Sequence, residues 1–294
     1  MKSRSSIKRC RPLLGTFVEI SISDDRPGHL LHGLADIAFG RIARVQSLMS
    51  FHDASSELSR LNACGHLHPL PVNEWTHEVI AEAVRLGAAS EGVFDITVAP
   101  ELVRWGFLPK RFAGEEHPVG TYQDIVLHAD GRISFEKPLL LDLGGIAKGF
   151  AVDKAAEFLI ESGVTEAVIN AGGDLRFIGA LPSHVALRDP RAPRERVIHT
   201  EVTAPAMATS AAYFANRRHH ARKVSHILHP RTRKPMCSNL SVSVFAQSCM
   251  DADALTKVVL LDDPSSWQNL LVREHASCVF ITSKGEAVSF PVAA

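Results

Sequence analysis

LDLGGIAKGFAVD, residues 141–153, joins an apolar run to an amphipathic segment through two adjacent glycines. The pattern predicts a buried strand over residues 139–143 and a helix over residues 146–162. Glycines at such a junction let the backbone approach a ligand, and the N–H groups at a helix start attract an anion. The junction therefore predicts either a phosphate site that Lys148 contacts, or a tight turn whose lysine faces solvent.

Regular patterns of apolar residues continue on both sides of this junction. Upstream they predict a strand over residues 16–23, helices over 29–49, 56–61 and 74–89, and a hairpin over 125–135. Downstream they predict strands over residues 168–170, 175–178, 185–188 and 241–246, a helix over 251–261, and a closing hairpin over 279–290. The predicted hairpins and helices do not follow the repeated strand–helix–strand order of a parallel sheet. This order indicates an α+β fold of mixed, largely antiparallel sheets with long packed helices. The sequence contains no convincing linker, so we expect a single domain over residues 1–294.

The overall composition excludes several classes of protein. Lys plus Arg and Asp plus Glu both number 32, and a chain with no basic surplus is not expected to bind nucleic acid. No apolar run is long enough for a membrane span. The five cysteines form no C-x-x-C pair, and the basic N-terminus is not followed by an apolar run. These features predict reduced thiols and a cytoplasmic location.

Three further segments place glycine, histidine or aspartate at the expected end of a strand or helix. Gly172-Gly173 stands between two strands and is either a hairpin turn or a ligand contact. His226 precedes a proline and an arginine, so it is either a core histidine or a general base beside a phosphate clamp. Asp253 lies near the start of a helix, where it either caps the helix or binds a cation.

Taken in order along the chain, these segments resemble the FAD:protein FMN transferase (ApbE) family. The matching segments extend over nearly the whole chain: LGT at 14–16, SELSRLN at 56–62, GVFDIT at 92–97, WGF at 105–107, DLGGIAKG at 142–149, AGGD at 171–174, TS at 209–210, HILHPRT at 226–232 and ADAL at 252–255. The chain is identified as a divergent member of this family.

The resemblance implies a specific reaction. Members of the family split FAD, attach FMN through a phosphoester to a Thr or Ser of an acceptor flavoprotein, and release AMP, with Mg²⁺ at the diphosphate. His226 would be the base or a phosphate contact, and Gly145, through its carbonyl, and Asp253 would hold the metal. The FAD site would be formed by Leu14, His52, Val93, Phe94, Asp95, Asp142, Lys148 and Ile227.

The expected metal site departs from the family pattern at one position. Lys257 stands four residues after Asp253, where the family has a Thr that completes the metal shell, and Thr256 is a possible substitute one position early. Residues at i and i+4 face each other on a helix, so Lys257 is expected to pair with Asp253 and to compete with Mg²⁺. The first hypothesis is an active FMN transferase. The alternatives are a catalytically inactive FAD-binding protein in which Lys257 replaces the metal, and an assembly partner without a ligand.

Other departures lie at the phosphate end of the expected site. His52 stands where the family has Tyr, and Ala211 replaces the Gly of its T-S-G segment. In the segment that begins at His226, His229 and Arg233 replace an Asp and a Gly.

Overall fold

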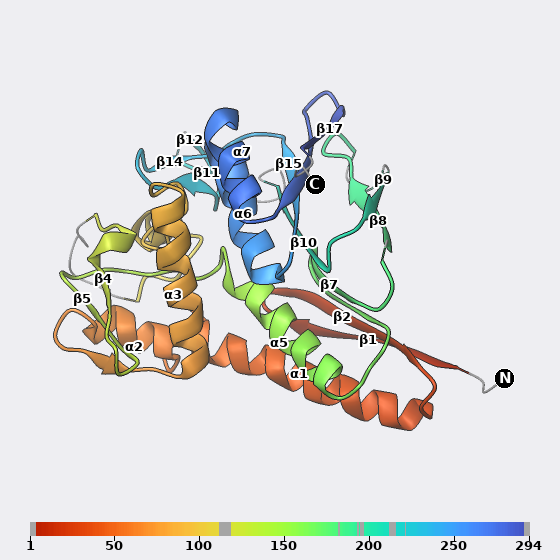
Figure 1. The fold of residues 1–294 in the computed structure, drawn as a ribbon. Helices are drawn as coiled ribbons and strands as arrows, with labels where there is room; N and C mark the ends of the chain where they lie inside the picture. The colour runs from red at the N-terminus through yellow and green to blue at the C-terminus, as the bar shows by residue number, and fades with distance from the viewer. Residues whose placement is uncertain are drawn as a thin grey trace.

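A large antiparallel sheet runs through the computed structural model (Figure 1). Residues 4–111, 119–181, 183–192, 194, 197–211, 216–220 and 222–290 are described by the structure. Within them the sheet has eight strands, in the order β1 (Ser5–Leu13), β2 (Thr16–Asp24), β6 (Ala167–Ala171), β7 (Asp174–Ile178), β10 (Ala206–Ala211), β15 (Ser241–Ala246), β16 (Ser277–Ile281) and β17 (Ala287–Phe290). Each neighbouring pair is antiparallel.

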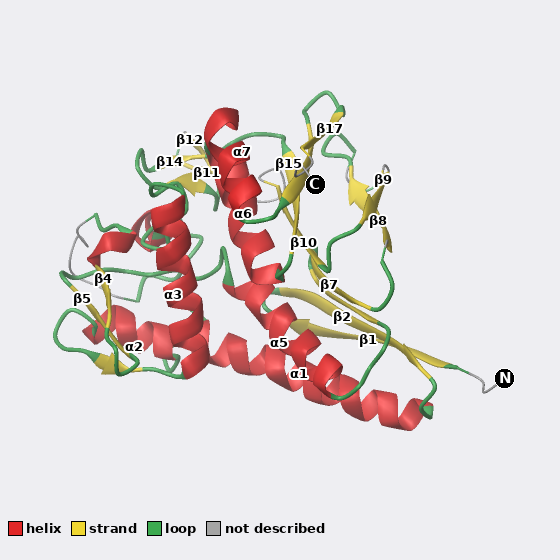
Figure 2. Ribbon diagram, viewed as in Figure 1, coloured by secondary structure: helices red, strands yellow, loops and turns green. Residues whose placement is uncertain are grey.

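Three helices cover one face of this sheet, α1 (Gly28–Met49), α5 (Ala147–Glu161) and α6 (Cys249–Leu261) (Figure 2). Successive strand residues point to opposite faces, so Ala206 and Ala208 of β10 join the main core under the helices. Met207, between them, belongs to a second apolar cluster on the other face. That cluster includes Leu187 and Val202 from the hairpin of β8 (Ser183–Arg188) and β9 (Val197–Val202).

A smaller unit packs beside the end of α1. It contains α2 (Glu57–Cys64), α3 (Glu74–Ala89) and a sheet of β3 (Leu70–Pro71), β5 (Arg132–Phe135) and β4 (Ile125–Leu127). Ser56 and Asn73 cap the two helices with their side-chain oxygens. The Glu57 carboxylate accepts the Asn73 N–H at 2.9 Å and the Thr76 hydroxyl at 2.7 Å, which joins the start of α2 to the start of α3.

Shorter elements complete the described chain. They are α4 (Ala99–Arg104), a 3-10 turn at Tyr122–Asp124, β11 (Arg217–His219), β12 (Arg222–Val224), β13 (Leu228–His229), β14 (Lys234–Pro235) and α7 (Pro264–Arg273). A search of the described residues finds no helix with the length and apolar content needed to cross a membrane. The five cysteines are free thiols.

The α+β class and the long helices expected from the sequence are confirmed, but the strand expected over residues 139–143 is wrong. This segment is buried and extended, yet its backbone pairs with no strand ladder. The Asn62 amide accepts the Leu141 N–H at 2.8 Å and donates to the Leu141 carbonyl at 3.0 Å. The Asp142 N–H donates to the Ile96 carbonyl at 2.8 Å. A side-chain amide and a loop therefore satisfy the polar groups that a sheet would otherwise pair.

Candidate functional site

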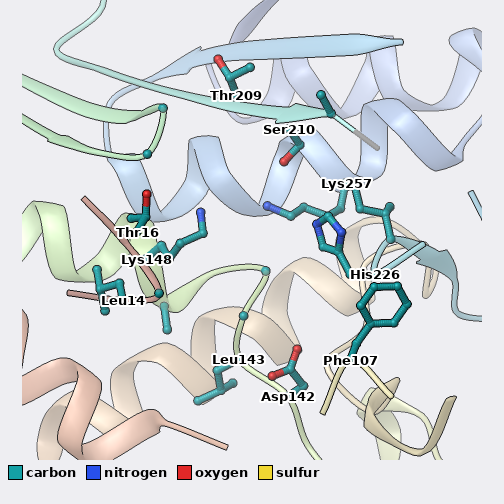
Figure 3. Close-up of a pocket in the computed structure, with 18 of the residues that line it drawn as sticks. Leu14, Thr16, Phe107, Asp142, Leu143, Lys148, Thr209, Ser210, His226 and Lys257 are labelled. Atoms are coloured by element: carbon teal, nitrogen blue, oxygen red, sulfur yellow. The ribbon is translucent and has the colours of Figure 1, made fainter. Parts of the chain in front are cut away.

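A cleft of about 1420 Å³ opens where the sheet edge, the helices and the smaller unit meet (Figure 3). Its walls come from segments far apart in the sequence, including the β1–β2 turn, the chain after α1, the 142–148 junction, the β6–β7 turn and α6. The sequence-predicted residues that line it are Leu14, His52, Val93, Phe94, Asp95, Asp142, Gly145, Lys148, His226, Ile227 and Lys257. Asp253 and Thr256 have no exposed surface and lie behind the wall. The cleft therefore gathers the predicted site residues in one place.

Two glycine-containing hairpin turns form part of the rim. Leu14 and Gly15 connect β1 to β2 with φ angles of 56° and 70°, and the Leu14 N–H donates to Gln46 Oε1 at 2.6 Å. Gly172 and Gly173 connect β6 to β7 with φ angles of 66° and 107°. Positive φ at both turn residues matches the strand twist of a two-residue hairpin. The turn expected at Gly172-Gly173 is therefore present, and it also faces the cleft.

The junction at residues 142–149 brings α5 against α6. A Cβ added to Gly149 would lie 2.1 Å from the Cys249 carbonyl oxygen, so the two helices approach at backbone distance there. The Gly149 N–H donates to Asp253 Oδ2 at 3.3 Å. This close approach places Lys148, in the first turn of α5, next to Asp253 of α6.

Four charged side chains form a cluster at this crossing. Lys148 forms an ion pair with Asp174, and its ammonium lies 3.6 Å from Asp253 Oδ2. Lys257 forms an ion pair with Asp253 Oδ1 and donates to the Asp253 carbonyl oxygen at 2.8 Å. The carboxylate side chains are 0–1% exposed, whereas those of Lys148 and Lys257 are 32% and 16% exposed toward the cleft. The i,i+4 pair expected between Asp253 and Lys257 is therefore present, and two positive charges balance two negative ones.

The cluster shifts the pKa of each carboxyl in a different direction. Burial would raise the pKa of Asp253, but the ammonium groups of Lys148 and Lys257 outweigh it and lower that pKa. Burial and the charge of Asp253 raise the pKa of Asp174 to about 6. Asp174 Oδ1 is buried without a hydrogen-bond partner among the described residues, which favours the neutral carboxyl further.

Lys257 lies between the glycine turn and the buried acid. A Cβ added to Gly145 would be 3.5 Å from Lys257 Cε, so the lysine stem passes directly over that glycine. The Thr256 hydroxyl is used elsewhere, because it donates to the Asp253 carbonyl at 2.6 Å and lies 2.7 Å from the Ser210 hydroxyl. Thr256 therefore does not face the cleft, and Lys257 does (Figure 3).

His226 stands beside these lysines at the cleft wall (Figure 3). Its ring makes an edge contact with Phe107, with ring centroids 6.2 Å apart. Desolvation by the surrounding protein and the charges of Lys257 and Lys148 lower the pKa of His226 to about 4. The imidazole is therefore neutral near pH 7, which leaves one ring nitrogen able to accept a proton.

NMR titration of the histidine ring should show this directly. We expect the His226 signals to titrate near pH 4 rather than near pH 6.5, because the protonated ring would be poorly solvated and would lie near the positive charges of Lys257 and Lys148. Replacing Lys257 with Thr should move the His226 pKa upward by removing its largest charged contributor. A His226 pKa of about 6.5 in the unmodified protein would show that neither desolvation nor the lysine charges lower it.

Two predicted acids differ in their surroundings. Asp95 accepts hydrogen bonds from the backbone N–H groups of Thr97 and Tyr122, both at 2.9 Å. These bonds fix the loop that forms one wall of the cleft. Asp142 stands at the glycine turn, where a Cβ added to Gly144 would lie 3.0 Å from its Oδ2. Burial raises the pKa of both carboxyls.

The loop after His226 keeps its shape despite its unusual residues. His229 Nδ1 accepts the N–H groups of Arg231 at 3.2 Å and Thr232 at 3.4 Å, as an Asp carboxylate does in a turn. Arg233 has a φ of 55°, a conformation that favours glycine, and its guanidinium bonds to the buried Glu101 at 3.0 Å. Both substitutions are therefore compatible with a folded loop.

Some residues of the site were missed by sequence reasoning. Asp174 directly follows the paired glycines, and an acid at a glycine turn was a usable signal. Phe107 lies within the WGF segment but was not assigned a contact. Ser210 lies within the TS segment but was not assigned a contact, and Gln46 gave no comparable signal, because its partner is distant in the sequence.

Comparisons with known proteins agree with this geometry. The family model described as "ApbE family" matches residues 14–280. The FAD:protein FMN transferase of Escherichia coli K12 is 27% identical over 265 residues, covering 82% of this chain and 74% of the relative. The FAD:protein FMN transferase of Vibrio cholerae is 32% identical over 236 residues, covering 73% and 69% respectively.

Solved structures give the same result for the fold. The ApbE protein of Thermotoga maritima superposes with a TM-score of 0.84 at 25% identity, covering 97% of this chain and 96% of that one. The flavin transferase ApbE of Vibrio cholerae superposes with a TM-score of 0.81 at 26% identity, covering 98% and 97%. With a family match over nearly its whole length and the corresponding fold, this chain belongs to the ApbE family.

Proposed function

We propose that this protein is an FAD:protein FMN transferase, which splits FAD and attaches FMN to a Thr or Ser hydroxyl of an acceptor flavoprotein. The observation that carries the proposal is the cleft, which gathers the residues expected at the FAD site from segments far apart in the sequence. The relatives named above are FAD:protein FMN transferases, so the inactive FAD-binding alternative is not favoured.

The proposed reaction is a phosphoryl-type transfer. The acceptor oxygen bonds to the FMN phosphorus, the bond from that phosphorus to the bridging oxygen breaks, and AMP leaves with that oxygen. Neutral His226 takes the hydroxyl proton as the new bond forms. Leu14, His52, Val93, Phe94 and Ile227 would hold the flavin nucleotide, together with Asp95 and Asp142, and Lys148 and the Gly144-Gly145 turn would face the diphosphate.

The donor groups at the expected metal position do not fit Mg²⁺. The Asp253 carboxylate already forms ion pairs with two ammonium groups and accepts a hydrogen bond from the Gly149 N–H. The Thr256 hydroxyl points away from the cleft. We therefore assign no step of the reaction to a metal.

The function is tested by incubating the protein with FAD and a flavin-acceptor domain. We expect covalent flavin fluorescence on the acceptor in a denaturing gel, with one AMP released per flavin attached. Two controls are an acceptor whose Thr or Ser is replaced by Ala, and FMN supplied in place of FAD. Absence of both products with tested acceptors, although FAD binds, would contradict the proposal.

The remaining expectations from the sequence are proposed in the same way. We propose that the acceptor belongs to a redox flavoprotein, that residues 1–294 act as one domain, and that the protein is cytoplasmic. Cell fractionation would check the location.

A further inference from the structure

We propose that Lys257 takes the place of the divalent metal in the diphosphate site, so that FAD binding and FMN transfer in this protein need no Mg²⁺. The inference rests on the proposed function and concerns the same cleft. It follows from the position of the Lys257 ammonium and from the charges around it.

The position of the Lys257 ammonium favours this role. The Lys257 stem passes over Gly145, and its ammonium contacts both the Oδ1 and the backbone carbonyl oxygen of Asp253. Gly145 and Asp253 are the two residues expected to hold the metal. The ammonium therefore lies on the two Asp253 oxygens, and its stem lies beside Gly145, the other residue expected to hold the metal.

The charges around Asp253 also oppose the binding of a divalent ion. Asp253 has no exposed surface, so its carboxylate needs nearby positive charge to remain ionised. Lys257 and Lys148 provide two positive charges within ion-pair distance. A divalent ion added between them would be repelled by both ammonium groups and would have to displace one of them from Asp253.

Lys148 and Lys257 both line the cleft in which the diphosphate of FAD is expected. Figure 3 shows Lys148 and Lys257 extending into the cleft above the glycine turn. Their ammonium groups can donate to the oxygens of a diphosphate while remaining bonded to the buried carboxylates, because each ammonium carries three N–H donors. As the phosphorus–oxygen bond to AMP breaks, Lys257 neutralises part of the charge on the departing oxygen, at a fixed position that requires no exchangeable ion.

The first experiment uses the unmodified protein and FAD. FAD affinity is measured by fluorescence in EDTA and in millimolar Mg²⁺, and binding of Mn²⁺ alone is measured by electron paramagnetic resonance. We expect the same Kd for FAD in both buffers and no specific Mn²⁺ site. Failure of FAD to bind at all would instead contradict the proposed function, so the two failures are distinguishable.

The second experiment restores the family residue with Lys257→Thr. In EDTA this variant should bind FAD about tenfold or more weakly, because one charge-assisted contact is lost. Mg²⁺ should restore the affinity, and Mn²⁺ alone should give a bound signal. The matched control is Lys154→Thr, since Lys154 is likewise a partly buried helix lysine in ion pairs, here with Glu78 and Glu157 at 3.2 and 3.0 Å, but it lies outside the cleft. We expect this control to bind FAD like the unmodified protein in both buffers.

Three results would overturn the proposal. One is tight Mn²⁺ binding to the unmodified protein, and another is a Kd for FAD that rises about tenfold or more in EDTA. The third is a folded Lys257→Thr variant, verified by circular dichroism, that binds no Mn²⁺. If that variant does not fold, Mn²⁺ binding and the Kd for FAD of the unmodified protein still test the proposal.

Discussion

Gly149→Ala is expected to destabilise this protein strongly. The added Cβ would lie 2.1 Å from the Cys249 carbonyl oxygen, 2.5 Å from its carbonyl carbon and 2.8 Å from the Met250 nitrogen. Overpacking costs about 1–3 kcal/mol where neighbours can adjust, and more where they cannot. Here every neighbour is backbone at the start of α6, so we expect a loss of about 3 kcal/mol or more in the free energy of unfolding, measured by urea denaturation.

Gly40→Ala is the matched control for this substitution. Gly40 also lies within a helix, α1, but a Cβ added there meets no atom within 4 Å among the described residues. Alanine is favoured over glycine in a helix interior, so the free energy of unfolding should rise by about 0.5–1 kcal/mol. Equal effects at the two positions would show that α5 and α6 do not approach as closely as described.

His226→Ala is expected to cause the largest loss of activity. A positioned general base contributes about 100- to 10,000-fold to a rate. We expect AMP release and flavin attachment to fall by about this factor, while FAD affinity and the midpoint of thermal unfolding change little, because the ring lies at the cleft wall and not in the core.

The measurement for His226→Ala is single-turnover release of AMP at saturating FAD and acceptor. A suitable control is His128→Ala, which removes a ring bonded to Ser134 on the small sheet, away from the cleft. If AMP release is unchanged in His226→Ala, the proton is taken by another group. If the rate falls only because FAD binds more weakly, His226 is a phosphate contact.

Much of this fold could be predicted because its signals are local. The helix α3 follows from an apolar pattern repeated every three to four residues and from the cap at Asn73. The Gly172-Gly173 turn follows from the need for positive φ at adjacent residues. The ion pair of Asp253 with Lys257 follows from one helical turn of spacing. The order of the motifs along the chain also indicated the family.

The missed strand at β1 shows where a local pattern is insufficient. No strand was predicted before residue 16, because residues 5–13 carry several basic side chains and no apolar run, yet every one of these residues is paired in register with β2. The strand lies at the sheet edge, where charged residues on the exposed face are tolerated and discourage further pairing. Its partner strand, and not its own apolar content, makes it a strand.

The sequence by itself determined helices α1, α2, α3, α5 and α6, the β4–β5 and β16–β17 hairpins and the pairing of Asp253 with Lys257, because each depends on residues within a few positions of one another. It did not indicate α4, α7 or the β8–β9 hairpin. The family followed from the order of the motifs along the whole chain. Only the tertiary structure decided that Asn62 holds the segment before the glycine turn, that Asp174 pairs with Lys148, and that Thr256 faces Ser210 instead of the cleft. These contacts join residues 26 to 79 positions apart. Their geometry follows from how the helices pack on the sheet, which no local pattern of residues encodes.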